Sequence, residues 1–380
     1  MIKLYDKDSY ISEFEATVTE CCECSGGFKI VLDKTAFFPT AGGQDCDTGT
    51  INGELVINVE IEDDVIYHTL NKPLAAGTVV TGKIDWQIRF RKMQHHSAEH
   101  IVSGLAHTLL QAENVGFHLS DKEVTIDYDR VLSGEEVLML ERAANAAVQQ
   151  NIGITAVYPT DEELEKINYR SKLELTENIR IVTIDEVDVC ACCAPHVKST
   201  GEIGVIKLKD VMHHRGGMRM RMICGNDALF DYENKCENAL RISNLLSSKQ
   251  EEIADSVERV VSELSEQKQK NAQLMKQLMT LKAEKIPESN QNFCIFEDGL
   301  DADGMRLLAN EGKMKCRTVI VLSGNDKAGY NYVIASEKEN LREKSRDINS
   351  ALGGRGGGRE DMIQGFFGST REEIERYFMN

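Results

Sequence analysis

The sequence predicts an α+β protein of several domains, and three observations carry this prediction. The 380 residues suffice for two or three domains with buried cores. Residues 1–90 are rich in short β-type runs separated by turn signals, whereas helical and strand patterns alternate after residue 91. Residues 238–285 contain neither Pro nor Gly and are rich in helix formers, so they separate two folded parts.

Residues 1–90 are predicted to form a small β-barrel. Apolar and polar side chains alternate along their strand-like runs, as expected for strands with one buried face. The clearest of these runs are residues 28–32, 55–59 and 79–82. Within this unit lies the glycine-rich stretch 37–44, where Gly42 and Gly43 let the backbone approach a ligand closely, although a simple turn explains the same pattern.

Residues 91–235 are predicted to form an α+β domain. Its first helix carries His96 and His100. A second long helix begins after Ser133, which is placed as its N-cap with Glu136 at the capping-box position. The predicted strands of this domain are 124–128, 181–184, 203–208 and 218–223.

Residues 238–286 are predicted to be a helical linker, either a coiled coil or a helical hairpin. Leu, Ile and Val recur at 3/4 spacing, and Gln250, Gln267 and Asn271 fill the remaining seam positions. Polar residues at such positions often set the register between helices. Pro287 ends the pattern because proline cannot continue a helix.

Residues 288–380 are predicted to form a C-terminal α/β domain. Its expected elements are strands at 318–322 and 332–335 and a helix at 340–351. That helix leads into a loop in which Arg355 and Arg359 flank Gly356 and Gly357. Glycines expose backbone N–H groups and arginines supply cations, so this loop is a candidate phosphate-binding element.

The net charge of −18 argues against broad nucleic-acid binding through bulk electrostatics, but local basic clusters remain. Three clusters in an otherwise acidic chain fit a protein that holds nucleic acid along a limited track. They are Arg89, Arg91 and Lys92; His213, His214, Arg215, Arg219 and Arg221; and Arg355 with Arg359.

Composition argues against a membrane or secreted protein. No apolar run approaches the roughly 18 residues of a membrane span, and the N-terminus has no apolar signal core. The 11 cysteines are clustered, so we expect reduced thiols in a cytoplasmic protein. The cluster Cys21, Cys22 and Cys24 has no matching partner cluster, so a second metal site there is not favoured.

Two short motifs offer metal ligands. His96 and His100 stand four residues apart on the first helix of the second domain and therefore on one helix face. Cys192 and His196 have the same spacing in a turn-like stretch in which Pro195 resists helix formation. Three imidazole nitrogens and one thiolate suit Zn²⁺, so we expect one zinc ion per chain at this site.

Other interpretations of these motifs stay open at this point. Two histidines at this spacing, without a second ligand motif, more often mark a solvated helix face than a metal site. Residues 96–100 also match the HxxEH pattern of inverted zinc peptidases, although a cysteine cluster is not typical of such enzymes. Cys190 and Cys193 lie close to Cys192 and compete with it as the sulfur ligand.

The order of these motifs resembles the alanyl-tRNA-editing proteins called AlaX, of the large type, and the matching C-terminal half of alanyl-tRNA synthetase. The similar stretches are 37–49 to the family's FYPEGGGQxxDxG, 96–100 to its HxxxH, 192–204 to its CGGTHVxxTGEIG, and 353–362 to the GGRGGGRPDMAQ of its DHH-associated domain. The resemblance covers almost all of the chain. It departs from the family where Thr40-Ala41 replaces Glu-Gly and Cys193-Ala194-Pro195 replaces Gly-Gly-Thr.

The resemblance implies a zinc-binding editing domain at 91–235 and a DHH-associated domain at 288–380. The zinc ligands that it implies are His96, His100, Cys192 and His196. The implied activity is a trans-editing hydrolase that deacylates tRNA(Ala) mischarged with serine or glycine. Because no aminoacylation core precedes the β-barrel in this sequence, we expect it not to charge tRNA. A homodimer formed through the C-terminal half is also implied.

The chemistry of such a reaction suggests candidate roles for individual residues. Gln44 and Thr40 are candidates to contact the substrate. Glu99 is a candidate base, although it points about 100° away from His100 on a helix. The residues expected to bind tRNA are Arg219, Arg355, Arg359, Gly356 and Gly357.

Two functions of other classes compete with editing. A non-catalytic tRNA-binding protein with structural zinc would bind tRNA but release no amino acid. A zinc peptidase of the HxxEH type would need a further carboxylate ligand and would cleave peptides without tRNA. Deacylation of mischarged tRNA(Ala) distinguishes editing from both.

Overall fold

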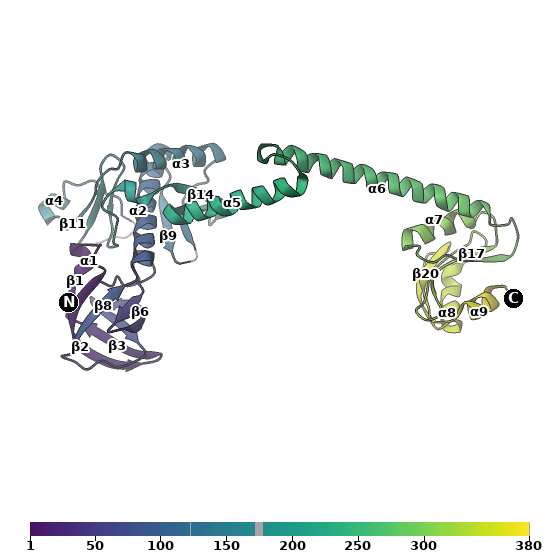
Figure 1. Ribbon diagram of the computed structural model, residues 1–380, viewed down its shortest axis with the longest axis horizontal. Helices are drawn as coiled ribbons and strands as arrows, with labels where there is room; N and C mark the ends of the chain where they lie inside the picture. The colour runs from purple at the N-terminus through teal and green to yellow at the C-terminus, as the bar shows by residue number, and fades with distance from the viewer. Residues whose placement is uncertain (122, 172–177, 380) are drawn as a thin grey trace. The chain divides into compact units, whose positions relative to one another are not determined.

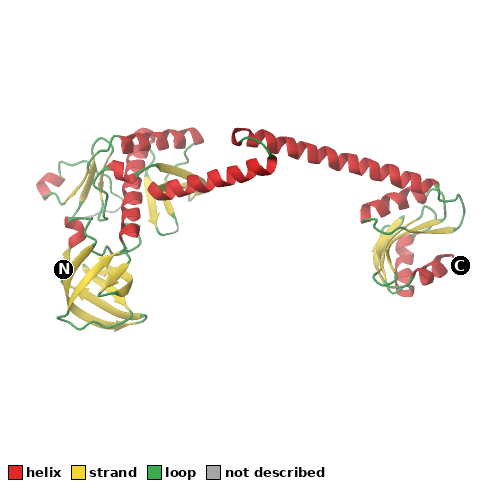
Figure 2. Cartoon of the chain, in the orientation of Figure 1, coloured by secondary structure: helices red, strands yellow, loops and turns green. Residues whose placement is uncertain are grey.

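The computed structural model describes residues 1–121, 123–171 and 178–379 (Figures 1 and 2). The chain divides into two compact units, Met1–Leu240 and Arg241–Asn380. Helices and strands occur in both units, which confirms the α+β class, whereas the finer division into four domains stays a prediction. Within the described residues, no helix is both long enough and apolar enough to cross a membrane.

The first unit begins with a closed β-barrel, purple in Figure 1, whose strands follow one another in the order β2-β3-β7-β6-β5-β8. They are β2 (Glu13–Cys24), β3 (Gly27–Leu32), β5 (Gly49–Ile51), β6 (Glu54–Glu62), β7 (Val65–Leu70) and β8 (Val79–Ile84). Along β2, Phe14, Ala16 and Val18 are buried and the residues between them are not, as expected for strands with one side facing a core. The short elements beside the barrel are β1 (Ile2–Lys3), α1 (Leu4–Lys7) and β4 (Lys34–Thr35).

A long helix, α2 (Trp86–Leu110), follows the barrel and forms the centre of the rest of this unit (Figure 1). Asp85 caps its N-terminus by accepting a hydrogen bond from the amide of Ile88. Every residue from Lys92 to Gly104 is buried, so the helix is covered on all sides there. A helix buried all round needs partners for its polar side chains, and these partners form the site described below.

Two antiparallel sheets and further helices surround α2. The sheets have the strand orders β14-β15-β10-β9 and β11-β12-β13. Their elements and the helices between them are β9 (Asn114–Leu119), β10 (Val124–Tyr128), α3 (Gly134–Gln149), β11 (Ile154–Val157), α4 (Asp161–Leu164), β12 (Ile181–Ile184), β13 (Asp188–Ala191), β14 (Ile206–His214), β15 (Gly217–Cys224) and α5 (Gly225–Leu246). The strand predicted at 203–208 begins only at Ile206, because a 3-10 turn occupies Thr200–Ile203.

Helix α3 has the capping box that the sequence predicts. The Ser133 hydroxyl accepts a hydrogen bond from the Glu136 amide (3.2 Å), and the Glu136 carboxylate accepts one from the Ser133 amide (2.7 Å). Replacing Ser133 by alanine is expected to lower the free energy of unfolding of the first unit by ~1 kcal/mol. Urea unfolding followed by the fluorescence of Trp86, the single tryptophan, measures this change. An unchanged midpoint and slope would show that the box does not stabilise the unit.

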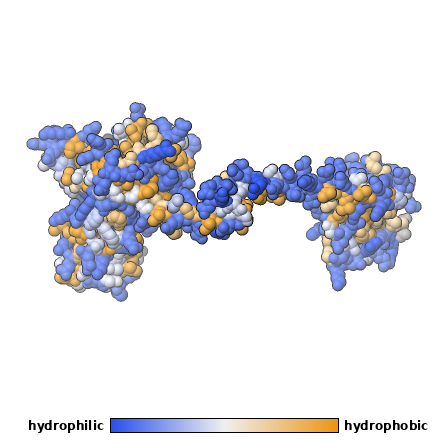
Figure 3. Space-filling view, turned by 45° about the horizontal axis from the view of Figure 1, so that its top comes forward, coloured by the Kyte–Doolittle hydropathy of each residue, from blue (hydrophilic) through white to orange (hydrophobic). Residues whose placement is uncertain are grey.

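The second unit packs helices against one five-stranded sheet. Its strand order is β16-β17-β18-β20-β19, with β16 parallel to β17 and the other neighbours antiparallel. The elements are α6 (Ile253–Glu284), β16 (Asn292–Phe296), α7 (Ala302–Gly312), β17 (Thr318–Asn325), β18 (Gly329–Ala335), α8 (Leu341–Ala351), β19 (Gly354–Gly358), β20 (Met362–Phe367) and α9 (Arg371–Met379). Tyr332 and Phe367 stack in its core with ring centroids 4.0 Å apart. The face of the second unit that is visible in Figure 3 is mostly hydrophilic, with scattered hydrophobic areas.

The helical linker predicted at 238–286 is interrupted. Helix α5 ends at Leu246, Ser247 has a φ of +50°, and a 3-10 turn at Gln250–Glu252 precedes α6. Gln250 therefore lies in a turn rather than at a helical seam position. A coiled coil stays a prediction for α6 alone, which ends before Pro287 as the sequence predicts.

The predicted glycine-arginine loop is a β-strand. Residues 354–358 form β19, which pairs antiparallel with β20 at the edge of the sheet. The strand lies so close to its neighbour that a Cβ on Gly356 would lie 2.3 Å from the Gln364 carbonyl oxygen. Glycine is thus needed here so that the backbones of β19 and β20 can approach closely. The sequence had instead suggested that the glycines form a loop.

The first basic cluster predicted from the sequence is not a surface patch. Arg89 and Lys92 are each 1% exposed because they lie within α2 and point into the protein. Arg91 forms an ion pair with Asp227 at 2.8 Å. Buried and paired cations cannot hold nucleic acid on the surface, so this part of the proposed track is wrong.

Candidate metal centre

Helix α2 and the loop after β13 bring the four predicted ligands together. His96 and His100 come from α2, and Cys192 and His196 from the loop. The Cys192 sulfur lies 3.4 Å from Nε2 of His96 and 3.4 Å from Nε2 of His196. One ligand atom from each of the four residues lies within 4.8 Å of the others. The arrangement selects Cys192, rather than the neighbouring Cys193, as the sulfur of this set.

A polar side chain contacts the second ring nitrogen, Nδ1, of each histidine. The three contacts are His96 with Gln44 Oε1 (2.8 Å), His100 with Asp188 Oδ2 (2.9 Å) and His196 with Ser97 Oγ (3.0 Å). An acceptor at Nδ1 favours the tautomer in which Nε2 carries a free lone pair. Such partners are typical of metal-binding histidines, because they fix both the tautomer and the orientation of the ring.

The electrostatics of the cluster favour a thiolate. Burial alone would raise the pKa of the Cys192 thiol, but the charge of His96 and hydrogen bonds from His100 and His196 outweigh it and hold that pKa well below its usual value. Burial lowers the pKa of His196 to about 3, so its imidazole is neutral. Burial acts on His100 too, but hydrogen bonds to Asp188 and Cys192 hold its pKa well above the usual value. A metal ion that binds here must displace the His100 proton.

The donor set is compatible with Zn²⁺. Three imidazoles and one thiolate converge on one point, which is a coordination set that zinc accepts in tetrahedral geometry. Mg²⁺ and Ca²⁺ take oxygen ligands, and none of the four donors is oxygen. A second group, His100, Asp188 and Cys190, shares His100 with the first, so it does not form an independent site.

A cavity of about 450 Å³ lies beside the cluster. His96, His100 and Cys192 form part of its wall. Gly42 and Gly43 form another part with φ of +60° and +78°, and a Cβ on Gly43 would lie 2.4 Å from the Phe117 carbonyl oxygen. Glycine is therefore required at position 43 for this part of the wall to pack against β9. The wall also includes Glu99, Phe117, Tyr158 and Arg180.

Glu99, the predicted base, lies in the wall of this cavity. It is 2% exposed, and its carboxylate accepts hydrogen bonds from the Ser103 hydroxyl and the Asn114 amide group. Glu99 thus lines the same cavity as His96, His100 and Cys192, although it is not one of the four candidate ligands. Its catalytic role stays a prediction.

Gln44 and Thr40, the predicted substrate contacts, lie in different environments. Gln44 is 1% exposed, its Oε1 contacts His96, and its Nε2 has no hydrogen-bond partner among the described residues. Thr40 is not part of the cavity wall that the described residues form, and its hydroxyl accepts a hydrogen bond from the Cys46 amide at 3.1 Å. A substrate contact by either residue stays a prediction.

The predicted tRNA-binding residues are divided between the two units. In the first unit, Arg219 on β15 binds both carboxylate oxygens of Asp127, at 2.6 and 2.7 Å. The predicted hairpin around it is formed by β14 and β15. The Arg219 charge is thus partly neutralised by its own sheet.

In the second unit, four of these residues lie on or beside the edge strand β19. Gly356 and Gly357 are within the strand, and Arg355 lies over the ring of Phe366 at 5.9 Å. The Arg359 side chain is 82% exposed and 3.7 Å from Asp361. These positions agree with a role at a surface, and tRNA binding by them stays a prediction.

Asp188 is the main residue of the site that the sequence does not reveal. It is 6% exposed at the start of β13, and it receives hydrogen bonds from Arg170 at 2.8 and 3.0 Å while contacting His100. The pKa of this carboxyl is lowered, because His100 and Arg170 outweigh the opposing effect of burial. No local motif marks it, since its partners lie 88 and 18 residues away.

Replacing Asp188 by asparagine is expected to lower the affinity for Zn²⁺ by ~10–100-fold. The amide cannot stabilise the charged ligand set as the carboxylate does, and it leaves the Arg170 charge without its partner. Competition with a chelating indicator measures the affinity. The matched control is Asp185→Asn, an exposed aspartate three residues earlier. Equal affinities of the two variants would show that Asp188 does not support the metal centre.

Two sequence families match parts of the chain. The family described as "Threonyl and Alanyl tRNA synthetase second additional domain" matches residues 179–261. The family described as "tRNA synthetases class II (A)" matches residues 3–88. The first match includes Cys192 and His196, and the second covers most of the β-barrel segment.

Curated proteins match almost the whole chain. Alanine–tRNA ligase of Pyrococcus furiosus is 32% identical over 387 residues, which cover 95% of this chain and 41% of the ligase. This chain therefore spans about two fifths of the length of such ligases. Alanyl-tRNA editing protein Aarsd1 of Rattus norvegicus is 25% identical over 386 residues, which cover 96% of this chain and 94% of that protein. The solved C-Ala domain from Aquifex aeolicus alanyl-tRNA synthetase matches 23% of this chain and 86% of that domain, at 24% identity and a TM-score of 0.20.

Proposed function

Because this chain is a relative of the alanyl-tRNA-editing proteins along almost its whole length, as its motifs predicted, we propose that it edits tRNA(Ala). The reaction is hydrolysis of the ester that joins serine or glycine to the 3′ end of the tRNA. The observation that carries the proposal is the His₃Cys cluster, three members of which, His96, His100 and Cys192, line a cavity of about 450 Å³. A cavity of this size accommodates a small ligand such as an aminoacyl ester.

The residues of the cluster have distinct tasks in this proposal. His96, His100, Cys192 and His196 would hold one Zn²⁺ ion, which when bound supplies a Lewis acid beside the ester. Gln44 and Asp188 offer acceptors that favour the required tautomer of His96 and His100, and the Ser97 hydroxyl contacts Nδ1 of His196 and orients that ring. Arg180 donates hydrogen bonds to the carbonyls of Cys192 (3.1 Å) and Ala194 (2.9 Å), so it holds the ligand loop in place.

Glu99 is proposed to accept a proton from the attacking water. Glu99 lines the cavity, and hydrogen bonds from Ser103 and Asn114 fix the orientation of its carboxylate. A carboxylate held in this way exchanges protons with a bound water without a large rearrangement. Gln44 and Thr40 are proposed to contribute to substrate selection from the loop beside the cavity.

The body of the tRNA is proposed to bind basic residues outside the cavity. Arg355 and Arg359 accompany Gly356 and Gly357 at the edge of the C-terminal sheet, and Arg219 lies in the first unit. Cations at a protein surface attract phosphates even when the whole chain is acidic. A homodimer through the C-terminal half is also proposed, supported by exposed apolar side chains on α6 such as Val261 (61%) and Leu274 (63%).

The decisive experiment is deacylation of tRNA(Ala) charged separately with serine, glycine and alanine by the purified full chain. Rapid loss of serine or glycine with alanine spared is the expected result. Survival of all three esters at the buffer rate, in protein shown to contain zinc, would contradict editing.

A second candidate is a tRNA-binding protein with structural zinc. The observation that favours it is the set of four protein ligands, because a closed site is typical of structural zinc whereas catalytic sites keep one position open. This candidate predicts tRNA(Ala) binding with no release of amino acid. Measuring binding by filter retention alongside deacylation separates the two functions.

A further inference from the structure

The glycine-rich stretch forms a loop whose two ends are joined by Asp47. The Asp47 amide donates a hydrogen bond to the Phe38 carbonyl at 3.0 Å, and its carboxylate accepts one from the Phe38 amide at 2.6 Å. The loop formed by residues 38–47 therefore begins and ends at this pair of residues, Phe38 and Asp47, which we call the neck of the loop. Asp47 is 1% exposed, so the neck is inside the protein.

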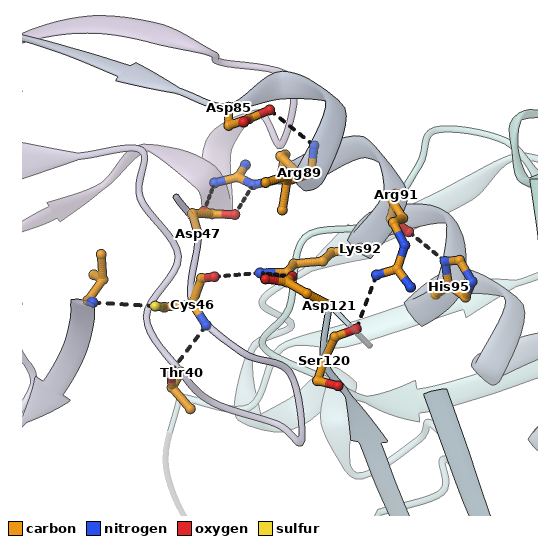
Figure 4. A network of polar contacts seen from close by, with 12 residues as sticks. Thr40, Cys46, Asp47, Asp85, Arg89, Arg91, Lys92, His95, Ser120 and Asp121 are labelled. Atoms are coloured by element: carbon orange, nitrogen blue, oxygen red, sulfur yellow. Dashed lines mark hydrogen bonds and ion pairs between the residues drawn. The ribbon is translucent and has the colours of Figure 1, made fainter. Parts of the chain in front are cut away.

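Arg89 of α2 contacts the Asp47 carboxylate at the neck (Figure 4). Its Nε donates to one carboxylate oxygen of Asp47 at 2.8 Å, and its Nη2 donates to the other. Further hydrogen bonds run from its Nη1 to the Ser9 carbonyl at 3.0 Å and from its Nη2 to the Ala36 carbonyl. Both charged side chains are fully buried. A buried bidentate pair with such additional acceptors has a narrowly defined geometry.

Lys92 makes a second contact one turn later on the same helix. Its Nζ donates to the Cys46 carbonyl at 2.6 Å and lies 3.5 Å from Asp121 (Figure 4). The Cys46 amide in turn donates to the hydroxyl of Thr40 inside the loop. Because Cys46 directly precedes Asp47, the two cations of α2 hold adjacent residues of the returning arm.

The tip of the loop, opposite the neck, reaches the His₃Cys cluster. Gln44 contacts Nδ1 of His96 at 2.8 Å, and the Gly43 carbonyl accepts a hydrogen bond from the Leu119 amide at 2.7 Å. Gly43 is also part of the cavity wall. His96 follows Arg89 by two turns of one helix, so the same rigid element carries both the contact at the neck and the ligand at the tip.

We propose that Arg89 and Lys92 are positioning residues that hold the loop 38–47 where Gln44 meets His96 and the glycines close the cavity. Neither residue lines the cavity. If the neck moves, His96 loses its acceptor at Nδ1 and one wall of the cavity shifts. The kinetic consequence rests on the proposed editing function, whereas the effect on the loop does not.

The test replaces the buried pair by apolar residues, Arg89→Met together with Asp47→Leu, in the full chain. This variant leaves no buried charge unpaired. Hydrogen–deuterium exchange of residues 38–47 is expected to become ~10-fold faster or more, while β3 keeps its protection. The kcat for deacylation of Ser-tRNA(Ala) is expected to fall ~10-fold or more with a smaller change in KM.

The matched control is Lys209→Met with Asp231→Leu, which removes a pair at 2.6 Å between β14 and α5. This control is expected to leave the exchange of the loop unchanged. Should the first variant not fold, Lys92→Met provides the test, because methionine keeps the apolar stem and removes only the cation. It is expected to accelerate exchange of the loop in the same direction by a smaller factor.

Unchanged exchange in residues 38–47 would overturn the proposal. An equal rise of exchange in β3 would also overturn it, because the pair would then stabilise the whole unit without positioning the loop. Failure of the unsubstituted protein to deacylate any tRNA would refute editing, and the exchange experiment would still decide the role of Arg89 and Lys92.

Discussion

Replacement of Cys192 by alanine is expected to abolish stable zinc binding and to slow deacylation of Ser-tRNA(Ala) by ~100-fold or more. The Cys192 thiolate would be the anionic ligand of the set, and its sulfur lies 3.4 Å from Nε2 of both His96 and His196. Without it, none of the remaining ligand atoms is anionic, and only the Asp188 carboxylate behind His100 offsets the charge of the dication. Metal content and deacylation rate are measured on one preparation, and circular dichroism checks that the protein is folded.

The control for this substitution is Cys236→Ala, which changes an exposed thiol on α5 far along the chain from the site. It is expected to keep both zinc and activity. Full zinc content in Cys192→Ala would show that the sulfur ligand has been assigned wrongly. Loss of zinc with an unchanged rate would instead assign the metal a structural role.

The grouping of the four candidate metal ligands was predictable from the sequence because each pair is local. His96 and His100 share a helix face at a spacing that the sequence shows directly, and Cys192 and His196 share one turn-rich loop. What joins the two pairs is the packing of α2 against β13, which is a property of the whole unit. The sequence therefore indicated the four candidate ligands but not the side chains that contact their Nδ1 atoms.

Asp188 and Arg89 show why the supporting residues could not be predicted. Each acts through a partner distant in sequence: 88 residues separate Asp188 from His100, and 42 separate Arg89 from Asp47. Arg89 was misassigned to a surface cluster, because arginine is usually exposed and only the fold reveals a buried acceptor for it. In the same way, the glycines of β19 suggested a loop, and only their pairing with β20 shows a strand.

Acidification below pH 6.5 is expected to destabilise the first unit, with His68 contributing up to ~3 kcal/mol. His68 lies in the core of the barrel, where Nε2 is 2.9 Å from the Thr35 hydroxyl and Nδ1 is 3.1 Å from the Ile30 carbonyl oxygen. Burial lowers its pKa from 6.5 to about 4. In the folded barrel the ring therefore stays neutral at pH values at which it is protonated in the unfolded chain.

The sign of the effect follows from the number of protons bound in each state. Between pH 6.5 and about 4, the unfolded chain binds more protons at His68 than the folded chain does. The free energy of unfolding therefore rises with pH across this window. The stabilising contribution is complete above pH 6.5 and is lost as the pH falls toward 4.

The measurement is urea unfolding at pH 7 and pH 4.5, followed by Trp86 fluorescence, for the unsubstituted protein and His68→Gln. Glutamine retains hydrogen-bonding capacity but does not titrate, so its loss of stability on acidification is expected to be smaller by ~2 kcal/mol. His95, whose pKa burial also lowers to about 4, is present in both proteins, so its contribution cancels in the difference. Equal losses in the two proteins would mean that the neutral state of His68 does not stabilise the barrel.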